Sequence, residues 1–420
     1  MKLVFFTHYF PPEGNAPASR TYEHCKRWVK AGHEITVITC APNVPNGVVY
    51  EGYQNRIWPQ REEIDGIKVI RVWTYVAANA GGGHRILNYV SYLFSAVFCF
   101  LFFVRRPDLV ISTSPQLFCG LAGSAASRLK WCPFLLEVRD IWPESIVTVG
   151  AMKKGVLIRF LERIEKWMYL SANHIVTVGK GYRDNILGKV DVAERISVIT
   201  NGVDLDSFPP CSPSQPFRDK YELGSKFTCA YVGTIGMAHG LSVVAEAAER
   251  LRKLGRADIA FCLIGDGANK NAIEEQVSEA GLSDWVKFTG RLAKEDMPMV
   301  LATADCLLIH LRKSDLFATV IPSKMFEAIA MQKPIVMAVQ GESADIVRQS
   351  GTGICIESED AEQLVNALLE LCDDEAVYQS LCEGGRDFVG RNYTRDALAA
   401  EYLEIIEKVA RAESVLGTVS

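Results

Sequence analysis

Several features that define other classes of protein are missing from this sequence. Its twelve cysteines are scattered, with no C-x-x-C pair and no cysteine–histidine cluster at the spacing of a metal site. In a chain of this length that usage predicts reduced thiols of a cytosolic protein. The apolar run at the amino terminus, MKLVFF, is too short for a secretory signal peptide, and we expect it to form the first strand.

Two common nucleotide-binding sequences are absent as well. No G-x-G-x-x-G lies within a dinucleotide-binding unit and no G-x-x-x-x-G-K-[ST] phosphate loop occurs, so a nicotinamide cofactor is not expected. Charge is unevenly spread: residues 1–205 carry 24 Lys and Arg against 17 Asp and Glu, whereas residues 206–420 carry 21 against 33. The basic half suggests an anionic partner, either a membrane surface or a phosphate-bearing substrate, or else only uneven solvated faces. We expect no nucleic-acid partner.

The chain of 420 residues exceeds what one core usually serves, which predicts two domains. Short β-branched runs alternate with helical patterns in both halves and indicate an α/β protein with two doubly wound, Rossmann-like parallel sheets. The predicted strands are KLVFFTHY, EITVITCA, IKVIRVWT, DLVISTS, FLLEVRD, HIVTVGK and ISVITNG, then FTCAYVG, AFCLIGDG, VKFTGR, DCLLIHL, PIVMAV and GICIES. We expect a first domain over 1–205, a Pro- and Ser-rich linker over 206–225 and a second domain over 226–395. Residues 396–420 form an amphipathic helix that packs across the hinge or back on the first domain.

Glycine turns follow several of the predicted strands. In open parallel sheets ligands bind beyond the carboxyl ends of the strands. FFTHYFPPEGNAPASR provides such a turn in the first domain, and GTIGMAHG and IGDG provide two in the second. Glycine lets the backbone approach a ligand, and the helix that follows offers N–H groups to an anion. Each turn alone suits packing as well as binding, but together they favour a nucleotide-binding cleft.

The stretch VIPSKMFEAIA places a lysine and a glutamate one helical turn apart. Glu327 suits the two hydroxyl groups of a ribose, because a carboxylate accepts two hydrogen bonds. The N–H groups of the turn at Ser323 and the ammonium group of Lys324 suit a diphosphate on the same ligand. The alternative is that Glu327 only complements the helix dipole and that Lys324 is a solvated surface residue.

The segment EVRDIWPES emerges from the carboxyl end of the buried strand FLLEV. Arg139 and Asp140 would there bind a sugar hydroxyl and orient an acceptor, and the carboxylate would assist its deprotonation. Alternatively, the two residues pair with neighbouring charges and only shape the turn. Their position at a strand end favours the functional interpretation.

With these motifs in view, the chain resembles the family-four retaining glycosyltransferases of the GT-B fold, in which two Rossmann-like domains face each other across a cleft. The resemblance covers essentially the full length and is strongest at VITNGVDLDSF, YVGTIGMAHGLSVVAEAA, LIGDG, VKFTGR and PSKMFEAIAMQKPIV. The forms EVRDIWPES and PSKMFEAIA are most similar to bacterial enzymes that build O-antigen, capsule or exopolysaccharide repeats, including N-acetylfucosamine transferases.

The resemblance implies that the second domain binds a nucleotide sugar and that the first faces the acceptor and the membrane. Glu327 matches the second glutamate of an E-x7-E element, which binds the ribose, and Gly14 matches a loop glycine that closes over the diphosphate. The implied donor-binding residues are Gly14, Asn15, Gly233, Thr234, His239, Gly265, Gly267, Arg312, Ser323, Lys324 and Glu327. The implied catalytic residues are Arg139, Asp140 and Lys324. No metal or other cofactor is implied, in keeping with the lack of a D-x-D motif in a suitable loop.

The sequence departs from the family pattern at three places. The first glutamate of E-x7-E falls at Thr319. The arginine and lysine that clamp the diphosphate fall at Thr234 and His239, neither of which carries a permanent charge. The first-domain histidine of the family falls at Arg139 or Asp140.

The implied mechanism makes the lost charges important. The family transfers the sugar with retention by a front-side displacement in which the departing diphosphate helps to accept the proton, so catalysis depends on cations aimed at the phosphates. We expect Lys324 to replace part of the missing charge, with Arg312 and Lys313 as further candidates.

A long apolar segment, Ile86 to Val104, contains no charged residue and is flanked by Arg85 and by Arg105-Arg106. By length it is a candidate membrane span, but it lies between strands of one predicted sheet, which a single crossing would separate. Two alternatives stay open: a buried helix, or a monotopic anchor in one leaflet. The basic amphipathic stretch GVLIRFLERIEKWMYL and the basic first half favour membrane contact.

We therefore expect a retaining glycosyltransferase at the cytoplasmic face of the cell membrane, bound peripherally or as a monotopic protein. It would move a sugar from a nucleotide sugar, in the first instance a UDP-sugar, to a polyprenyl-diphosphate-linked saccharide in bacterial surface polysaccharide synthesis. A sugar-nucleotide epimerase on the same fold is one alternative. The other is a catalytically silent scaffold at the membrane, which the changes at Thr319, Thr234 and His239 would permit.

Overall fold

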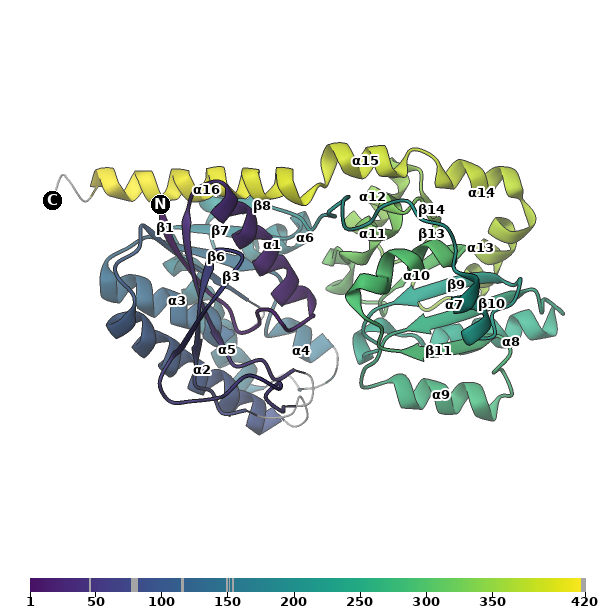
Figure 1. The fold of residues 1–420 in the computed structure, drawn as a ribbon, viewed down its shortest axis with the longest axis horizontal. Coiled ribbons are helices and arrows are strands. Elements are labelled where there is room, and N and C mark those ends of the chain that lie inside the picture. Colours follow the sequence, from purple (N-terminus) through teal and green to yellow (C-terminus); the bar gives the residue numbers. More distant parts are fainter. Residues whose placement is uncertain are drawn as a thin grey trace. The chain divides into compact units, whose positions relative to one another are not determined.

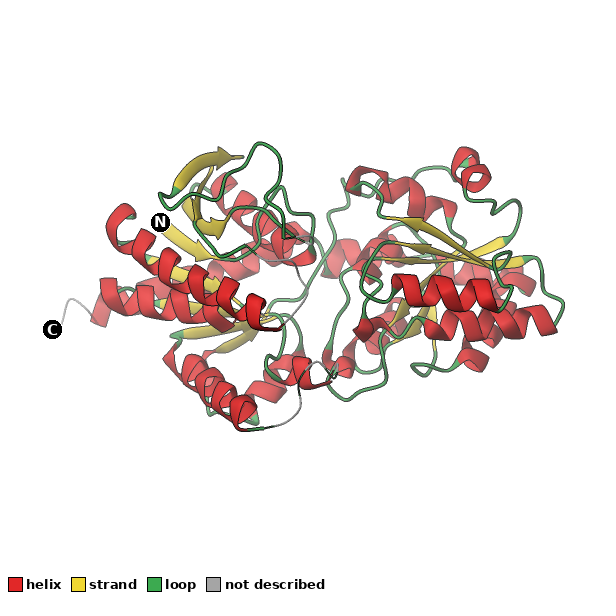
Figure 2. Ribbon diagram, turned by 90° about the horizontal axis from the view of Figure 1, so that it is seen from below, coloured by secondary structure: helices red, strands yellow, loops and turns green. Residues whose placement is uncertain are grey.

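A computed structural model describes residues 1–44, 47–76, 82–114, 117–148, 150, 152 and 155–416 of the chain. The chain forms two compact units, each with helices on both sides of its own β-sheet (Figures 1 and 2). The first unit comprises Met1–Thr200 together with the segment from Arg395 onward, and the second comprises Asn201–Thr394.

The first unit contains an eight-stranded sheet in the order β3-β4-β2-β1-β5-β6-β7-β8. Its strands are β1 (Lys2–Phe6), β2 (Glu34–Cys40), β3 (Gln60–Ile64), β4 (Ile67–Val72), β5 (Leu109–Thr113), β6 (Phe134–Val138), β7 (His174–Thr177) and β8 (Ile196–Val198). All neighbouring strands run parallel except β3 and β4, which form an antiparallel hairpin. The seven predicted strands are confirmed, whereas β3 was not predicted.

Helices cover both faces of this sheet because β1 is apolar on both sides. Phe5 belongs to a core that also contains Trp28 of helix α1 (Ala16–Lys30), and the next residue, Phe6, contacts Phe100 of helix α2 (Gly82–Phe103) on the opposite face. Alternate residues of a strand point to opposite faces, so a two-faced strand is expected to be apolar throughout. The helices of the unit are α1 (Ala16–Lys30), α2 (Gly82–Phe103), α3 (Leu117–Lys130), α4 (Glu144–Thr148), α5 (Val156–Ser171), α6 (Lys180–Leu187) and α16 (Arg395–Leu416).

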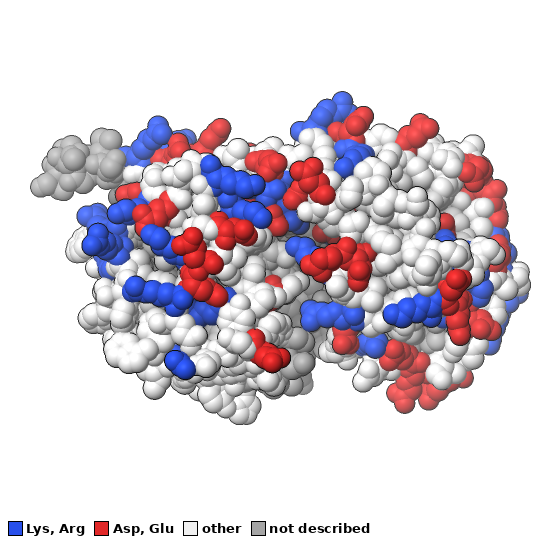
Figure 3. Space-filling model, viewed as in Figure 1, with Lys and Arg blue, Asp and Glu red and all other residues white. Residues whose placement is uncertain are grey.

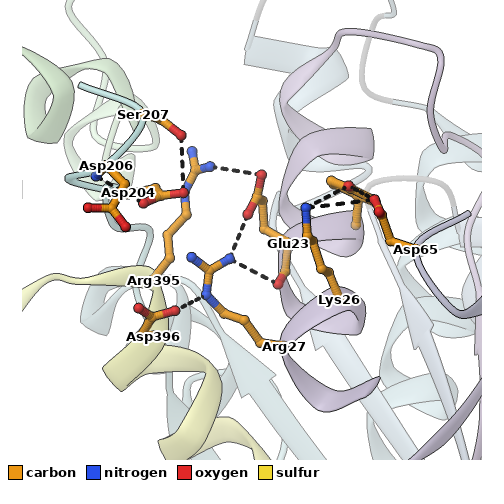
Figure 4. A network of polar contacts seen from close by, with 10 residues as sticks. Glu23, Lys26, Arg27, Asp65, Asp204, Asp206, Ser207, Arg395 and Asp396 are labelled. Carbon is orange, nitrogen blue, oxygen red and sulfur yellow. Dashed lines mark hydrogen bonds and ion pairs between the residues drawn. The ribbon is translucent and has the colours of Figure 1, made fainter. Parts of the chain in front are cut away.

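Helix α16 returns to the first unit at the end of the chain and packs against α1. Tyr402 is fully buried, and its ring meets the edge of the Trp28 indole, whose N–H group donates a 3.0 Å hydrogen bond to the Ala399 carbonyl. Glu23 of α1 accepts from Arg27 at 2.6 Å and lies 3.4 Å from Arg395, and Arg27 also pairs with Asp396 (Figure 4). The last helix is thus part of the first core.

The second unit contains a six-stranded, fully parallel sheet in the order β11-β10-β9-β12-β13-β14. Its strands are β9 (Phe227–Val232), β10 (Ile259–Ile264), β11 (Val286–Gly290), β12 (Cys306–His310), β13 (Ile335–Ala338) and β14 (Gly353–Cys355), all of them predicted. Its α-helices are α7 (Gln215–Lys220), α8 (Ser242–Lys253), α9 (Lys270–Glu279), α10 (Met297–Thr303), α11 (Lys324–Ala330), α12 (Glu342–Ser350), α13 (Ala361–Asp373), α14 (Glu375–Cys382) and α15 (Gly385–Asn392).

The segment 206–225, which we expected to be a linker, belongs to the second unit. Within it Ser214 caps α7 by accepting from the Phe217 N–H group, and Arg218 donates to the Thr303 carbonyl and pairs with Asp305 at 3.0 Å. Proline and serine here mark a helix start as well as an irregular chain.

Candidate active site

The order of strands in the second sheet reverses between β9 and β12, which is where an open α/β sheet binds its ligand. The loops that leave the carboxyl ends of β9, β10 and β12 contain most of the predicted donor-binding residues.

The glycine loops after β9 and β10 touch each other through their backbones. A Cβ atom added at Gly265 would lie 1.8 Å from the carbonyl oxygen of Gly233, and one added at Gly267 would lie 2.4 Å from that of Ile235. The Ile235 N–H group donates a 2.9 Å hydrogen bond to the Asp266 carbonyl. Gly265 and Gly267 are thus required for packing the two loops together, and a nucleotide would meet only their backbone.

Lys324 lies directly beside these loops. Its Nζ atom is 3.5 Å from the centre of the Tyr231 ring, and a Cβ atom added at Gly233 would lie 3.6 Å from the same nitrogen. Burial lowers the pKa of Lys324 to about 7, and the nearby Glu327 carboxylate opposes that shift. Among the described residues none accepts a hydrogen bond from this ammonium group or lies within ion-pair distance of it. An anion placed there would meet an unpaired cation held by an aromatic face.

His239 contributes no permanent charge to the predicted donor site. Its Nδ1 atom accepts from the Gly236 N–H group at 3.3 Å, and burial followed by the charge of Lys324 lowers the pKa of His239 to about 3. The edge of its ring meets Tyr231, whose hydroxyl donates to the Thr234 carbonyl at 2.7 Å. His239 is therefore neutral near pH 7, and of the predicted residues at β9 and α11 only Lys324 can carry a positive charge.

Ser323 and Glu327 lie at the start of helix α11, as predicted. Ser323 occupies the N-cap position without a side-chain capping bond, and Glu327 is half-buried in the first turn. Thr319, which stands where the family has a carboxylate, donates its hydroxyl to the Leu316 carbonyl at 2.7 Å. Lys324 and Glu327 thus lie one turn apart on α11, as the sequence spacing predicted.

Arg312 follows β12 and reaches the same loop. Its backbone N–H group donates a 2.9 Å hydrogen bond to the Ala238 carbonyl, and its side chain, 47% exposed, has its Nε atom 3.7 Å from a carboxylate oxygen of Glu359. Lys313 instead points to Glu357 at 3.2 Å. Arg312 is accordingly the better placed of the two additional cations.

In the first unit, Arg139 holds the start of α1. Its guanidinium group donates 3.1 Å hydrogen bonds to the carbonyls of Ala16 and Pro17, immediately after Gly14 and Asn15. Asn15 accepts from the Ala18 N–H group and caps α1, whereas a Cβ atom at Gly14 would meet nothing within 4 Å. Arg139 is therefore engaged in positioning this loop, and its role toward a sugar stays a prediction.

Asp140 follows β6 and is half-buried. One carboxylate oxygen accepts a 3.0 Å hydrogen bond from the Ser145 hydroxyl. Burial raises the pKa of Asp140, and the Ser145 bond opposes that rise. A carboxylate with a raised pKa at a strand end is suited to general-base chemistry.

Two residues of the candidate site were not predicted from the sequence. Tyr231 supports Lys324, and His310 contacts the loop that carries His239. Both stand near the ends of apolar strands, in FTCAYVG and DCLLIHL. A polar or aromatic side chain in the last positions of a buried parallel strand was the available signal, since those positions reach the binding edge of the sheet.

Each half of the chain matches a glycosyltransferase family profile. The profile of the family described as "Glycosyl transferases group 1" matches residues 214–388, and that of the "Glycosyl transferase 4-like domain" matches residues 15–202. The protein named "Putative colanic acid biosynthesis glycosyl transferase WcaI" from Escherichia coli (strain K12) is 24% identical over 96% of this chain and 97% of its own length.

Solved structures with the same fold cover nearly the whole chain. The sucrose-phosphate synthase from Thermosynechococcus elongatus has a TM-score of 0.74 at 16% identity, covering 98% of this chain and 99% of that one. The Anabaena protein HepE in complex with UDP and glucose has a TM-score of 0.71 at 17% identity, covering 97% and 99%. These similarities establish the two-sheet fold expected from the sequence.

Proposed function

We propose that this chain uses a UDP-sugar to extend a lipid-linked saccharide of a bacterial surface polysaccharide. The chain belongs to the family-four glycosyltransferases of the GT-B fold, a retaining family that transfers a sugar from a nucleotide sugar. The similarity to a protein named for colanic acid biosynthesis supports the pathway class, and the similarity to a structure holding UDP supports the donor. A polyprenyl diphosphate is the proposed carrier of the acceptor.

The observation that carries this proposal is the ammonium group of Lys324, which has no hydrogen-bond acceptor and no ion-pair partner in the described part of the chain. It lies on the Tyr231 ring beside the glycine loops, at the switch point of the second sheet. A diphosphate bound there would receive the charge that the family supplies from positions occupied here by Thr234 and His239. The silent-scaffold alternative gives no role to this half-buried cation.

The proposed reaction replaces one bond at the anomeric carbon of the donor with another. The bond between the anomeric carbon and the diphosphate oxygen breaks, a bond from the acceptor oxygen forms on the same face of the sugar, and the acceptor proton passes to the departing diphosphate. Lys324 stabilises the negative charge that develops on the leaving group. Glu327 holds the ribose and Asp140 orients the acceptor hydroxyl and assists its deprotonation.

Helix α2 supports the proposed location at the membrane. The segment Ile86–Phe103 has a mean hydropathy of 1.9 and is long and apolar enough to cross a bilayer. Only 28% of this segment is buried within the protein. Phe94, Phe98 and Phe102, spaced by one turn, are 70%, 50% and 70% exposed. The opposite stripe is buried and contains Asn88, whose side-chain amide donates to the Tyr75 carbonyl. Because α2 packs on a sheet strand through one stripe, its free apolar stripe is suited to lie in one leaflet rather than to span it.

The surroundings of this stripe match an anionic membrane surface. Arg105 and Arg106 follow α2 and are exposed, and no Asp or Glu occurs in α2. Helix α5, which contacts α3 as α2 does, exposes Phe160 and Trp167 together with Arg163 and other cations, while its Glu165 is buried. In Figure 3 the lowest part of the first unit, near the α2 label of Figure 1, is mostly white, with few charged side chains. We propose that this apolar surface enters the cytoplasmic leaflet, with the cations at its edge meeting acidic headgroups.

Replacing Phe94, Phe98 and Phe102 together with serine should lower binding to vesicles of phosphatidylglycerol and phosphatidylcholine by at least about tenfold, because each buried phenylalanine contributes roughly 1.5–3 kcal/mol. Vesicle co-sedimentation of the full chain measures this. The matched control is Leu254→Ser, which alters an apolar residue of the second unit that is 59% exposed. Equal vesicle binding by the triple variant and the wild type would refute the membrane assignment.

Glu327→Gln should raise the Kd for the donor by roughly tenfold, because a hydrogen bond to a charged group contributes about 1.5–3 kcal/mol. Titration calorimetry with a UDP-sugar gives this value. Glu362→Gln is the matched control, since Glu362 also lies in the first turn of a helix, α13, but is 69% exposed beside Arg250. If both variants bind the donor as the wild type does, Glu327 does not contact the nucleotide.

The function is tested by incubating the protein, in detergent, with UDP- and GDP-sugars and a polyprenyl-diphosphate saccharide. A lengthened saccharide and free nucleotide are the expected products. Conversion of the donor to its epimer without acceptor would favour the epimerase. Failure to bind any nucleotide or nucleotide sugar would favour the scaffold and overturn the proposed transfer.

A further inference from the structure

His310, the last residue of β12, is 1% exposed and uses both ring nitrogens. Nδ1 lies 2.6 Å from the carbonyl oxygen of His239, and Nε2 lies 2.9 Å from the backbone nitrogen of Glu359. The carbonyl requires a donor and the N–H group requires an acceptor, so Nδ1 carries the hydrogen and Nε2 does not. Both bonds exist together only in the neutral ring.

The first of these bonds fixes the turn after β9. Residues Met237–His239 form a single 3-10 turn that ends at Gly240, where φ is 57°. A Cβ atom added at Gly240 would lie 3.1 Å from Cε1 of His310, so the turn lies against the imidazole itself. Ala238 is tied to the same strand end through the Arg312 N–H group.

The second bond fixes the loop at Glu359, whose backbone conformation is energetically unfavourable. Glu359 has a φ of 62°, a left-handed conformation that side chains other than glycine rarely adopt. Its carboxylate accepts from the Lys313 N–H group at 2.8 Å and faces the Arg312 side chain. Such a residue persists where its neighbours determine its conformation, and these residues often lie at ligand sites.

We propose that His310 is a positioning residue for the donor: its neutral ring joins the turn that carries His239 to the loop that carries Glu359, and thereby sets where the diphosphate meets Lys324. This inference rests on the proposed function, since it concerns the same donor site. His310 does not touch the reacting atoms. It acts through the backbone of the 236–240 turn, which packs on Tyr231 through the His239 ring.

The arrangement also gives the site a dependence on acid. The groups that face His310 are the His239 turn, Glu359, Arg312 beyond Gly240, and Lys324 on α11. Burial lowers the pKa of His310, and the charge of Lys324 adds a smaller lowering, whereas the hydrogen bond to the His239 carbonyl and the charge of Glu359 raise this pKa. The ring is thus neutral at pH 7. As pH falls through this lowered pKa, Nε2 gains a proton and can no longer accept the hydrogen bond from the Glu359 N–H group. The loop at Glu359 then loses this contact, and donor affinity should fall.

The test compares His310→Leu, His310→Asn and His310→Gln in the full-length protein. Leucine removes both hydrogen bonds and should raise the KM for the UDP-sugar roughly fivefold to tenfold with a smaller change in kcat. The asparagine amide stands near the place of Nδ1 and should recover most of the donor affinity. The glutamine side chain reaches the place of Nε2 instead, and should recover less, because the bond to the donor-side turn stays broken.

Two comparisons separate a failed inference from a failed function. Wild-type protein that binds no UDP-sugar in the calorimeter would overturn the proposed function itself. If the wild type binds the donor and His310→Leu has the same KM and the same pH dependence between about pH 5 and pH 8, the inference is overturned. A lower Tm with unchanged KM, or no recovery by asparagine, would mean a purely structural histidine and would also overturn it. His174→Leu is the matched control, since His174 is a partly buried histidine of the first unit whose Nε2 contacts Ser197.

Discussion

Lys324→Met should reduce kcat by roughly 10²–10³-fold, which corresponds to about 2.7–4 kcal/mol of lost transition-state stabilisation. The unbranched methionine side chain fills a similar volume, so the Tyr231 ring keeps a packing partner while the charge disappears. The effect should be large because the positions that supply cations in the family hold Thr234 and a neutral His239 here. Steady-state and single-turnover kinetics with a UDP-sugar and the saccharide acceptor provide the measurement.

The same lysine predicts an alkaline limit to donor binding. Its pKa in the empty site is about 7, and a bound diphosphate would raise it, so the complex holds the proton more tightly than the free enzyme. The contribution of Lys324 to donor affinity should therefore be fully present below pH 7 and decline by up to about tenfold per pH unit above it. The methionine variant should bind weakly without this decline.

A second lysine serves as the control. Lys333 is also partly buried with a pKa lowered by burial, but it lies after α11, near Asp305. Lys333→Met should leave kcat and the alkaline dependence close to those of the wild type. If Lys324→Met behaves in the same way as this control, the diphosphate is stabilised elsewhere, and Arg312 becomes the next cation to test.

The strands could be predicted because parallel strands buried on both faces must be apolar almost throughout. The exception is β3, QREEI, which pairs only with β4 at the edge of its sheet and so needs few apolar residues. The sequence feature that could have predicted this hairpin is the turn between β3 and β4, not the β3 strand itself. Asp65 and Gly66 both have positive φ, 49° and 78°, as a two-residue hairpin turn requires, and an Asp-Gly pair is typical of it.

The candidate site was partly predictable for a related reason. Residues at the ends of parallel strands reach the same edge of the sheet, so Gly233, Gly265 and Lys324 could be grouped without knowing the structure. Which of them touch could not be predicted. The contact of Lys324 with Tyr231 joins residues on α11 and β9, and its pKa depends on how deeply that pair is buried. Likewise, the sequence of α2 is apolar all round and does not say that Phe98 faces outward while Tyr92 and Phe100 are buried.

Asp140→Asn should lower the rate of transfer to the acceptor by about 10²-fold or more, within the usual range for a positioned general base, while donor binding changes little. Hydrolysis of the donor by water should fall less than transfer, because orientation of the saccharide hydroxyl is what the variant loses. Comparing the two rates separates this role from a structural one. Equal losses in hydrolysis, transfer and Tm would indicate that Asp140 only shapes the turn after β6.

The pH profile provides the sharper form of this test. A base must be ionised, so kcat/KM for the acceptor should fall as pH decreases through the pKa of Asp140, which burial raises. The hydrogen bond from Ser145 stabilises the carboxylate and keeps that pKa lower than burial alone would. Ser145→Ala should therefore move the acid limb to higher pH while retaining most of the rate at alkaline pH, and Asp140→Asn should remove that limb. A limb that stays in place in both variants would assign the titration to another group and leave the acceptor proton to the departing diphosphate alone.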